Sequence, residues 1–329
     1  MAILNSALKI ILCVAASAGV MGGVQAAEAD EYPTRPIRII VPFAAGGGVD
    51  ATARIIGEQI AKKLGKPVYI ENKPGAGGLI GVRQTIAAPA DGYTLLLSAA
   101  GEVVINPVFN KEAGYDPSKD LVPVAVVVRA PNLLAVGTEV PVKSVAELIE
   151  YGRKHPGELT YSSSGVGTIQ HITGEIFSKV AGIEARHVPY SGAAPATLDV
   201  ASNQVSMTFS SPGAVMPFAQ KGQLRVLAVA MSKRYSELAE LPSIKESPGM
   251  SAFNVESWFA LFAPAGVPSS IITRLNAEVR EAMHKPEVAE KLIKNVGIPS
   301  FEDETQAKAF IDEEIARYST IVKELNIRP

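Results

Sequence analysis

The chain of 329 residues contains one cysteine and one tryptophan, and neither sign of charge dominates its 31 basic and 33 acidic side chains. The cysteine, Cys13, lies among the first 26 residues, so the rest of the chain offers no disulfide, thiolate nucleophile or thiolate ligand. Because phosphate binding requires a basic excess, the balanced charge argues against a nucleic-acid partner. After residue 30 no apolar run approaches the roughly 18 residues that suggest a membrane span.

Residues 1–26 are predicted to be a secretory signal peptide. They carry one charge, Lys9, followed by the apolar stretch Ile10–Val20, about half the ~20 residues of a spanning helix. Val24 and Ala26 satisfy the small-residue rule for cleavage after Ala26, and cleavage one or three residues later would satisfy it too. The alternative, a buried N-terminal helix, is disfavoured by its three glycines. We therefore expect the protein in the periplasm.

From Ile37 onward, short β-rich runs alternate with helical patterns, which predicts an α/β fold with parallel sheets and crossover helices. Expected strands cover residues 37–41, 68–70, 93–98, 122–128, 133–136, 159–162, 185–189, 205–210, 225–230 and 257–263. The last strand is followed by three helical patterns, which cannot form a sheet alone. We expect it to return to the first lobe, giving lobe 1 (33–128 plus 254–329), lobe 2 (129–253) and a cleft between them.

A Gly-rich turn, Pro42–Val49, connects the first strand to a helix. Such a junction presents main-chain N–H groups at the positive end of a helix and can bind an anion without a basic side chain. Gly46 to Gly48 let the main chain approach a ligand closely. We interpret Asp50 as a cap that accepts hydrogen bonds from first-turn amides, with ligand contact as the alternative.

Two junctions of the same kind, Tyr161–Thr168 and Val188–Pro195, follow strands of the second lobe. Their hydroxyl and amide groups are expected to hold the other side of a solute, and Tyr190 adds a ring face and a hydroxyl. An ordinary helix cap with solvated serines is the alternative for the first of them.

Signatures of chemistry are weak. Gly46-x-Gly48-x-x-Ala51 with Glu71 resembles a dinucleotide fingerprint, but Asp50 would place a negative charge near the pyrophosphate. No Gly-x-Ser-x-Gly, His-Glu-x-x-His or phosphate-binding loop motif is present, and the four histidines have no metal-ligand spacing. We expect no cofactor and no metal.

Two further aromatic residues have two interpretations each. His171 either lines the cleft or packs within its helix, and Trp258 either packs in the core or lines the hinge side of the cleft.

Taken together, these segments resemble the Bug-type solute receptors of tripartite tricarboxylate transporters over nearly the whole chain after residue 26. The landmarks are Tyr32–Ile37, Val41–Asp50, Glu71–Gly78, Asp91–Leu96, Val188–Pro195 and Phe262–Pro268.

The resemblance implies a two-lobe periplasmic binding protein of the Venus-flytrap type (type II) with two crossover segments. It implies a monomeric receptor, not an enzyme, that binds a small carboxylate and delivers it to two integral membrane subunits. The implied ligand-binding residues are Phe43, Ala45, Gly47, Gly48, Ser98, Ser163, Gly165, Thr168, Tyr190, Ser191 and Ser210.

Departures from the family pattern bear on the ligand. Relatives often carry a basic residue where Ser191 stands and acids where Ser206 and Ser210 stand. A missing cleft carboxylate disfavours an ammonium-bearing amino acid, so we expect a dicarboxylate or an aromatic carboxylic acid. An exported enzyme acting on a small acid, or a receptor that signals to a membrane kinase, remain the alternatives.

Overall fold

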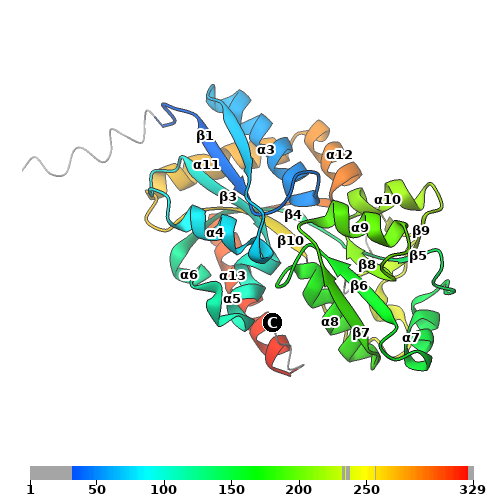
Figure 1. Ribbon diagram of the computed structural model, residues 1–329. Helices are drawn as coiled ribbons and strands as arrows, with labels where there is room; N and C mark the ends of the chain where they lie inside the picture. Colours follow the sequence, from blue (N-terminus) through cyan, green and yellow to red (C-terminus); the bar gives the residue numbers. More distant parts are fainter. Residues whose placement is uncertain (1–31, 232–233, 235–237, 256, 325–329) are drawn as a thin grey trace, which may run out of the picture.

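The computed structural model describes residues 32–231, 234, 238–255 and 257–324, which form two mixed β-sheets with helices on both faces (Figure 1). The predicted signal peptide lies outside the described residues. The larger sheet has the spatial order β11 (Ile298–Glu302), β4 (Leu121–Arg129), β10 (Trp258–Pro264), β3 (Thr94–Ala99), β1 (Ile37–Val41) and β2 (Val68–Asn72). The smaller has the order β7 (Ala185–Pro189), β6 (Leu159–Ser163), β8 (Met207–Ser210), β5 (Leu133–Gly137) and β9 (Leu224–Val229).

We call the larger sheet and its helices lobe 1, and the smaller sheet and its helices lobe 2. The α-helices of lobe 1 are α3 (Gly48–Leu64), α4 (Leu79–Ile86), α5 (Asn106–Phe109), α6 (Pro117–Asp120), α11 (Ser269–Met283), α12 (Pro286–Asn295) and α13 (Glu304–Glu324). Those of lobe 2 are α7 (Val145–Lys154), α8 (Ile169–Ala181), α9 (Ala193–Ala201) and α10 (Pro212–Ala219). Short turns of helix are η1 (Ala76–Gly78), η2 (Gly101–Ile105), η3 (Lys111–Ala113) and η5 (Ile244–Glu246). The exact residues at which each lobe ends stay a prediction.

Each sheet is buried between two helical layers. In β1, Ile39 belongs to the apolar cluster that includes α3, α11 and α12, whereas Ile40 belongs to the cluster on the opposite face. This alternation follows from the two-residue period of a strand. In α3, Ile56 and Ile60 are one turn apart and fully buried, and the helix ends at Gly65, whose φ of 65° is the left-handed conformation that glycine adopts readily.

The predicted α/β fold is confirmed, but each sheet is mixed, where the sequence pattern had indicated parallel pairing. β1 pairs in parallel with β2 and β3, and β6 with β7 and β8, as crossover helices require. The pairings of β5 with β8 and β9, of β10 with β3 and β4, and of β11 with β4 are antiparallel. β5 is the first strand after the chain enters lobe 2, and β10 is the first strand after it returns to lobe 1. The two passages meet where the Ala130 N–H donates to the Ser257 carbonyl at 2.8 Å.

Besides the short helices and helical turns, β11 and α10 were absent from the prediction. β11 contains Pro299, and α10 contains Pro212 and Pro217, residues that normally interrupt strands and helices. Here β11 is an edge strand, and Pro212 occupies the first helical position, where its missing N–H has no partner to lose. Among the described residues, no helix has the length and apolar character needed to cross a membrane.

Candidate functional site

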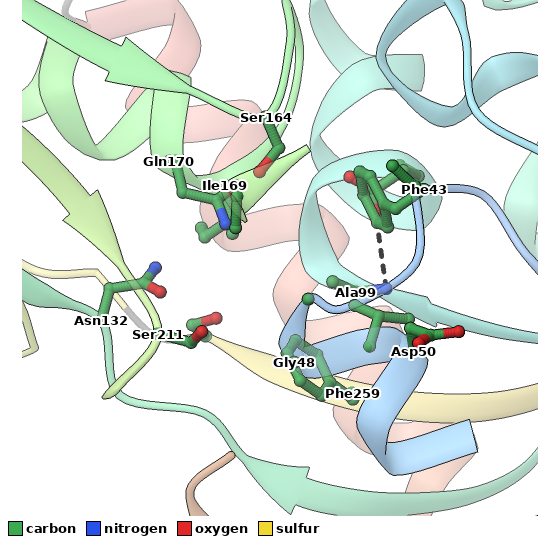
Figure 2. A pocket seen from close by; sticks show the side chains of 16 residues that line it. Phe43, Gly48, Asp50, Ala99, Asn132, Ser164, Ile169, Gln170, Ser211 and Phe259 are labelled. Carbon is green, nitrogen blue, oxygen red and sulfur yellow. Dashed lines mark hydrogen bonds between the residues drawn. The ribbon is translucent and has the colours of Figure 1, made fainter. Parts of the chain in front are cut away.

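A pocket with a cavity volume of about 30 Å³ lies between the lobes (Figure 2). Ser164, Ile169 and Gln170 of lobe 2 lie across it from Phe43 and Gly48 of lobe 1. The full lining is Phe43, Ala44, Gly47, Gly48, Val49, Asp50, Ala99, Glu102, Asn132, Ser164, Ile169, Gln170, Ala193, Ser211, Ser257 and Phe259. Both passages between the lobes contribute, through Asn132 and Ser257, so the pocket lies at the hinge.

Four helices of lobes 1 and 2 begin at this pocket. The first residues of α3, α8 and α9 line it, and so does Ser211, the residue before α10. No side chain caps α3, α9 or α10, whereas Thr168 accepts a hydrogen bond from the His171 amide at the start of α8. The first-turn N–H groups of a helix have no partner inside the helix and carry its positive partial charge. Their convergence makes the pocket favourable for an anion.

The lining contains no Lys, Arg or His, and its two ionisable residues are Asp50 and Glu102. Asp50 is not the first-turn cap predicted from the sequence. Its carboxylate accepts hydrogen bonds from Arg54 at 2.9 and 3.0 Å, from the Asn72 amide group and from the N–H of Gly46, which precedes the helix. Burial opposes ionisation, but these bonds hold the pKa of Asp50 below its usual value. The carboxylate therefore fixes the Gly-rich turn, with its charge balanced by Arg54.

Glu102 was not predicted. It lies in η2 directly after β3, its side chain is fully buried, and burial raises its pKa to about 8. Its Oε2 accepts hydrogen bonds from the Ser98 hydroxyl at 3.1 Å and the Ala99 N–H at 3.2 Å. Ser98, a predicted ligand-binding residue, thus contacts the Glu102 carboxyl and is absent from the pocket lining.

Several buried polar atoms of the pocket have no hydrogen-bond partner within the described chain: Glu102 Oε1, Asn132 Nδ2, Ser211 Oγ and Ser257 Oγ. An unsatisfied buried polar group costs about 1–3 kcal/mol and is usually explained by a missing partner. The lining also includes apolar side chains, such as Phe43 and Phe259. A ligand with polar ends and an apolar body would satisfy both kinds of wall.

Glycines let the lobes approach closely around the pocket. A Cβ built at Gly77 would lie 1.8 Å from the Val166 carbonyl oxygen, and one at Gly101 would lie 2.5 Å from the Ile169 nitrogen. Real Cβ atoms do not come so near to main-chain atoms, so side chains at these positions would hold the lobes apart. The structure therefore shows a closed arrangement that depends on these glycines.

The predicted residues fall into three groups. Phe43, Gly47 and Gly48 line the pocket, whereas Ala45 is exposed and its neighbour Ala44 lines it. Gly165, Tyr190 and Ser191 line a second pocket of about 460 Å³, which shares Phe43 and Ser164 with the first. Ser98, Ser163, Thr168 and Ser210 are buried and line neither pocket.

The tyrosine and serine of lobe 2 have protein partners. The Tyr190 hydroxyl donates to Asp199 at 2.5 Å, and burial together with this bond raises its pKa to about 12. Ser210 Oγ has no partner within the described chain, and the next residue, Ser211, lines the pocket. Ser211 could have been suggested from the sequence, because it lies at the end of a predicted strand and directly before a proline. Asn132 and Ser257 could have been suggested only by their place at the predicted crossings.

Ser163 Oγ lies 2.6 Å from His187 Nε2, the kind of pair that can activate a nucleophile. The Ser163 hydroxyl, however, also bonds the Gly165 main chain and lines neither pocket. Burial lowers the pKa of His187 to about 4, which makes it a weak base, and its ring stacks on His171 at 4.1 Å. This geometry is suited to holding the turn before α8.

His171 and Trp258 both follow their packing interpretations. His171 Nδ1 accepts a hydrogen bond from the Gly167 N–H, and the residue lines neither pocket. Trp258 is fully buried, and its indole N–H donates to Glu314 at 2.8 Å.

Comparison with known proteins places this geometry in a family. Residues 52–327 match the family model described as the tripartite tricarboxylate transporter family receptor. BugT of Bordetella pertussis is 33% identical over 318 residues, covering 96% of each chain. Two solved structures of Rhodopseudomonas palustris proteins are also similar. Rpa4515 with adipate is 35% identical, with a TM-score of 0.86 over 91% of this chain and 99% of that one. MatC with bound malate is 30% identical, with a TM-score of 0.82 over 88% of this chain and 100% of that one. The chain belongs to the receptor family of tripartite tricarboxylate transporters, and its two-lobe fold is that of periplasmic solute-binding proteins.

Proposed function

We propose that this protein is a periplasmic receptor that binds a carboxylate solute, either a dicarboxylate or an aromatic carboxylic acid, in the pocket between its lobes. The observation that carries this proposal is the convergence of four helix starts and four unsatisfied polar atoms on a pocket without a basic side chain. Main-chain amides can hold a carboxylate there with the field of the helix ends. The adipate and malate bound by the two related proteins support the same ligand class.

The walls of the pocket favour a ligand with an apolar body. Val49 and Phe259 from lobe 1 and Ile169 from lobe 2 contribute apolar side chains, while the polar groups come from the helix starts and the hinge. The cavity of about 30 Å³ adjoins the second pocket of about 460 Å³, with which it shares Phe43 and Ser164, so the two together offer room for a small solute. A diacid with an apolar chain, or an aromatic ring with a carboxylate, matches the polar and apolar walls.

The proposal includes binding without conversion. The close serine–histidine pair, Ser163 with His187, lies outside both pockets, which supports a receptor rather than an enzyme. Export by the peptide 1–26, a monomeric state and delivery to two integral membrane subunits complete the proposal, supported by the family membership.

A thermal-shift screen of the chain from residue 27 onward tests this function. Adipate, malate and benzoate are compared with glutamate and aspartate, because a ligand that binds only the folded state raises the melting temperature. Acids that raise it are titrated by calorimetry, and their NMR spectra are followed during incubation to detect turnover. Ser211→Ala, which removes a polar group of the pocket, should weaken binding of the same acid. Binding of amino acids alone, or conversion of the acid, would contradict the proposal.

A further inference from the structure

Glu102 places a carboxyl group in the wall of the pocket. Its Oε2 is fixed by the Ser98 hydroxyl and the Ala99 N–H, while Oε1 has no hydrogen-bond partner within the described chain. Gly78 makes room for the side chain, since a Cβ there would lie 2.3 Å from the Glu102 Cγ. The Tyr115 hydroxyl also donates to the Glu102 main-chain carbonyl. The carboxyl is therefore held in one place at the wall of the pocket.

The surroundings disfavour a negative charge on this group. Glu102 is fully buried, the pocket lining has no basic side chain, and burial raises its pKa to about 8. A neutral carboxylic acid has one O–H donor. Because Oε2 already accepts two hydrogen bonds, the donor of a neutral Glu102 would be Oε1, the oxygen without a partner within the described chain.

The other titratable groups near η2 have partners or lie in separate contacts. Asp50, which lines the same pocket, is paired with Arg54 on its own helix, and burial lowers the pKa of His171 on α8 to about 4, so its ring is neutral. Other groups on the elements packed against η2 also have partners: Glu175 accepts from Tyr161, and Arg83 donates to the carbonyls of Glu112 and Ala113. On α13, Glu314 pairs with Arg317 and Lys308 pairs with Asp312.

We propose that the Glu102 side chain remains protonated in the pocket and donates a hydrogen bond from Oε1 to a carboxylate oxygen of the bound solute. This inference rests on the proposed function and adds a specificity-determining residue to it. The receptor then binds an ionised carboxylate by a proton that it supplies itself, in place of an arginine or lysine. When Glu102 is ionised before binding, it must take one proton from the solvent as the solute binds.

The test is calorimetry with adipate from pH 6 to pH 9, a range over which adipate is a dianion except near its acid end. In the wild-type protein, binding is expected to be about tenfold weaker at pH 9 than at pH 7, because only the protonated receptor binds well. Titrations at pH 9 in buffers of different ionisation enthalpy should show uptake of about one proton per adipate. In Glu102→Gln the side-chain amide replaces the acid O–H by a weaker N–H donor, so adipate binding should be several-fold weaker at pH 7. Because the amide does not titrate, the affinity of this variant should be independent of pH above 7.

Glu175→Gln is the matched control, since Glu175 lies on α8 and lines neither pocket. It should keep the pH profile of the wild type. A wild-type affinity that is flat or rises with pH, or a Glu102→Gln variant that retains the wild-type profile, would overturn the inference while leaving carboxylate binding intact. Failure of adipate, malate and benzoate to bind at any pH would instead refute the proposed function, and this inference with it.

Stability without ligand provides a second readout of the proton. The folded pKa of Glu102 lies above the value of about 4.3 in an unfolded chain, so unfolding releases the proton between the two values. The urea midpoint of the wild type should therefore fall relative to that of Glu102→Gln as the pH rises from 5 to 8. Equal pH dependence of the two midpoints would show that Glu102 is ionised in the folded protein, and would overturn the inference.

Discussion

A single main-chain N–H can be removed from the pocket by replacing Gly48 with proline. Gly48 is the first residue of α3, a position that tolerates proline because its N–H has no partner within the helix. The preceding Gly47 has φ −85° and ψ 172°, the extended conformation that residues before proline favour. The helix should therefore form normally in Gly48→Pro while the pocket loses one amide donor.

The matched control is Gly48→Ala. A Cβ at this position lies 3.2 Å from the Phe259 ring and 3.6 Å from Ser211 Cβ in either variant, so both share this steric contact. Only the proline lacks the N–H. A hydrogen bond to a charged group contributes about 1.5–3 kcal/mol, so Gly48→Pro should bind adipate roughly 10- to 150-fold more weakly than Gly48→Ala.

Calorimetry of both variants, with melting temperatures as a check on folding, gives the comparison. Equal affinities in two equally stable variants would refute the role of the α3 amides, and with it the central element of the proposed site. A proline variant that melts much earlier than the alanine variant would show that the N1 assignment is wrong.

Three further variants test other parts of the structure. Gly101→Ala places a methyl group against the main chain of the opposite lobe and should weaken adipate binding roughly 5- to 150-fold, the equivalent of an overpacking cost of about 1–3 kcal/mol. Gly57→Ala, which adds a methyl group inside lobe 1 and lines neither pocket, is the control in the same calorimetric comparison. Trp258→Phe removes the hydrogen bond to buried Glu314 and should lower the free energy of unfolding, measured by urea titration, by about 1–3 kcal/mol. The affinity for adipate should be unchanged. A loss of affinity without a loss of stability would show that Trp258 contacts the ligand. Ser257→Ala should weaken binding roughly 2- to 13-fold, for about 0.5–1.5 kcal/mol of hydrogen bonding, without lowering the melting temperature; an unchanged affinity would show that its unsatisfied hydroxyl does not meet the solute.

Local patterns predicted most strands and helices but not their pairing. The predicted strand 185–189 coincides with β7, and the helix predicted to end before Gly65 ends there. These features depend on residues close in sequence. Strand direction depends on which strands carry the chain between lobes, so the antiparallel β5 and β10 could not be inferred from their own residues.

The same distinction applies to the site. The Gly-rich turn was predictable because glycines between a strand and a helix have a local meaning, and Phe43, Gly47 and Gly48 do line the pocket. Glu102 had no local signal, since its importance comes from burial beside the opposite lobe. Asn132 was likewise invisible, because an asparagine at a crossing resembles any polar loop residue until the lobes are brought together.

The unsatisfied groups also explain how ligand binding and closure are coupled. In the closed arrangement, four polar atoms of the pocket are buried without partners, each at a cost of about 1–3 kcal/mol. Opening the lobes would expose them to water, so the empty protein is expected to favour an open arrangement. A solute that bonds these atoms removes the cost only in the closed state, and this difference in affinity is what shifts the population. Closure of the lobes then indicates that a solute is bound. Ser257→Ala removes one unsatisfied group and so lowers the free-energy cost of closing the ligand-free protein. Without ligand, this variant should be more compact than the wild type in small-angle scattering. An unchanged scattering profile would show that these groups do not oppose closure.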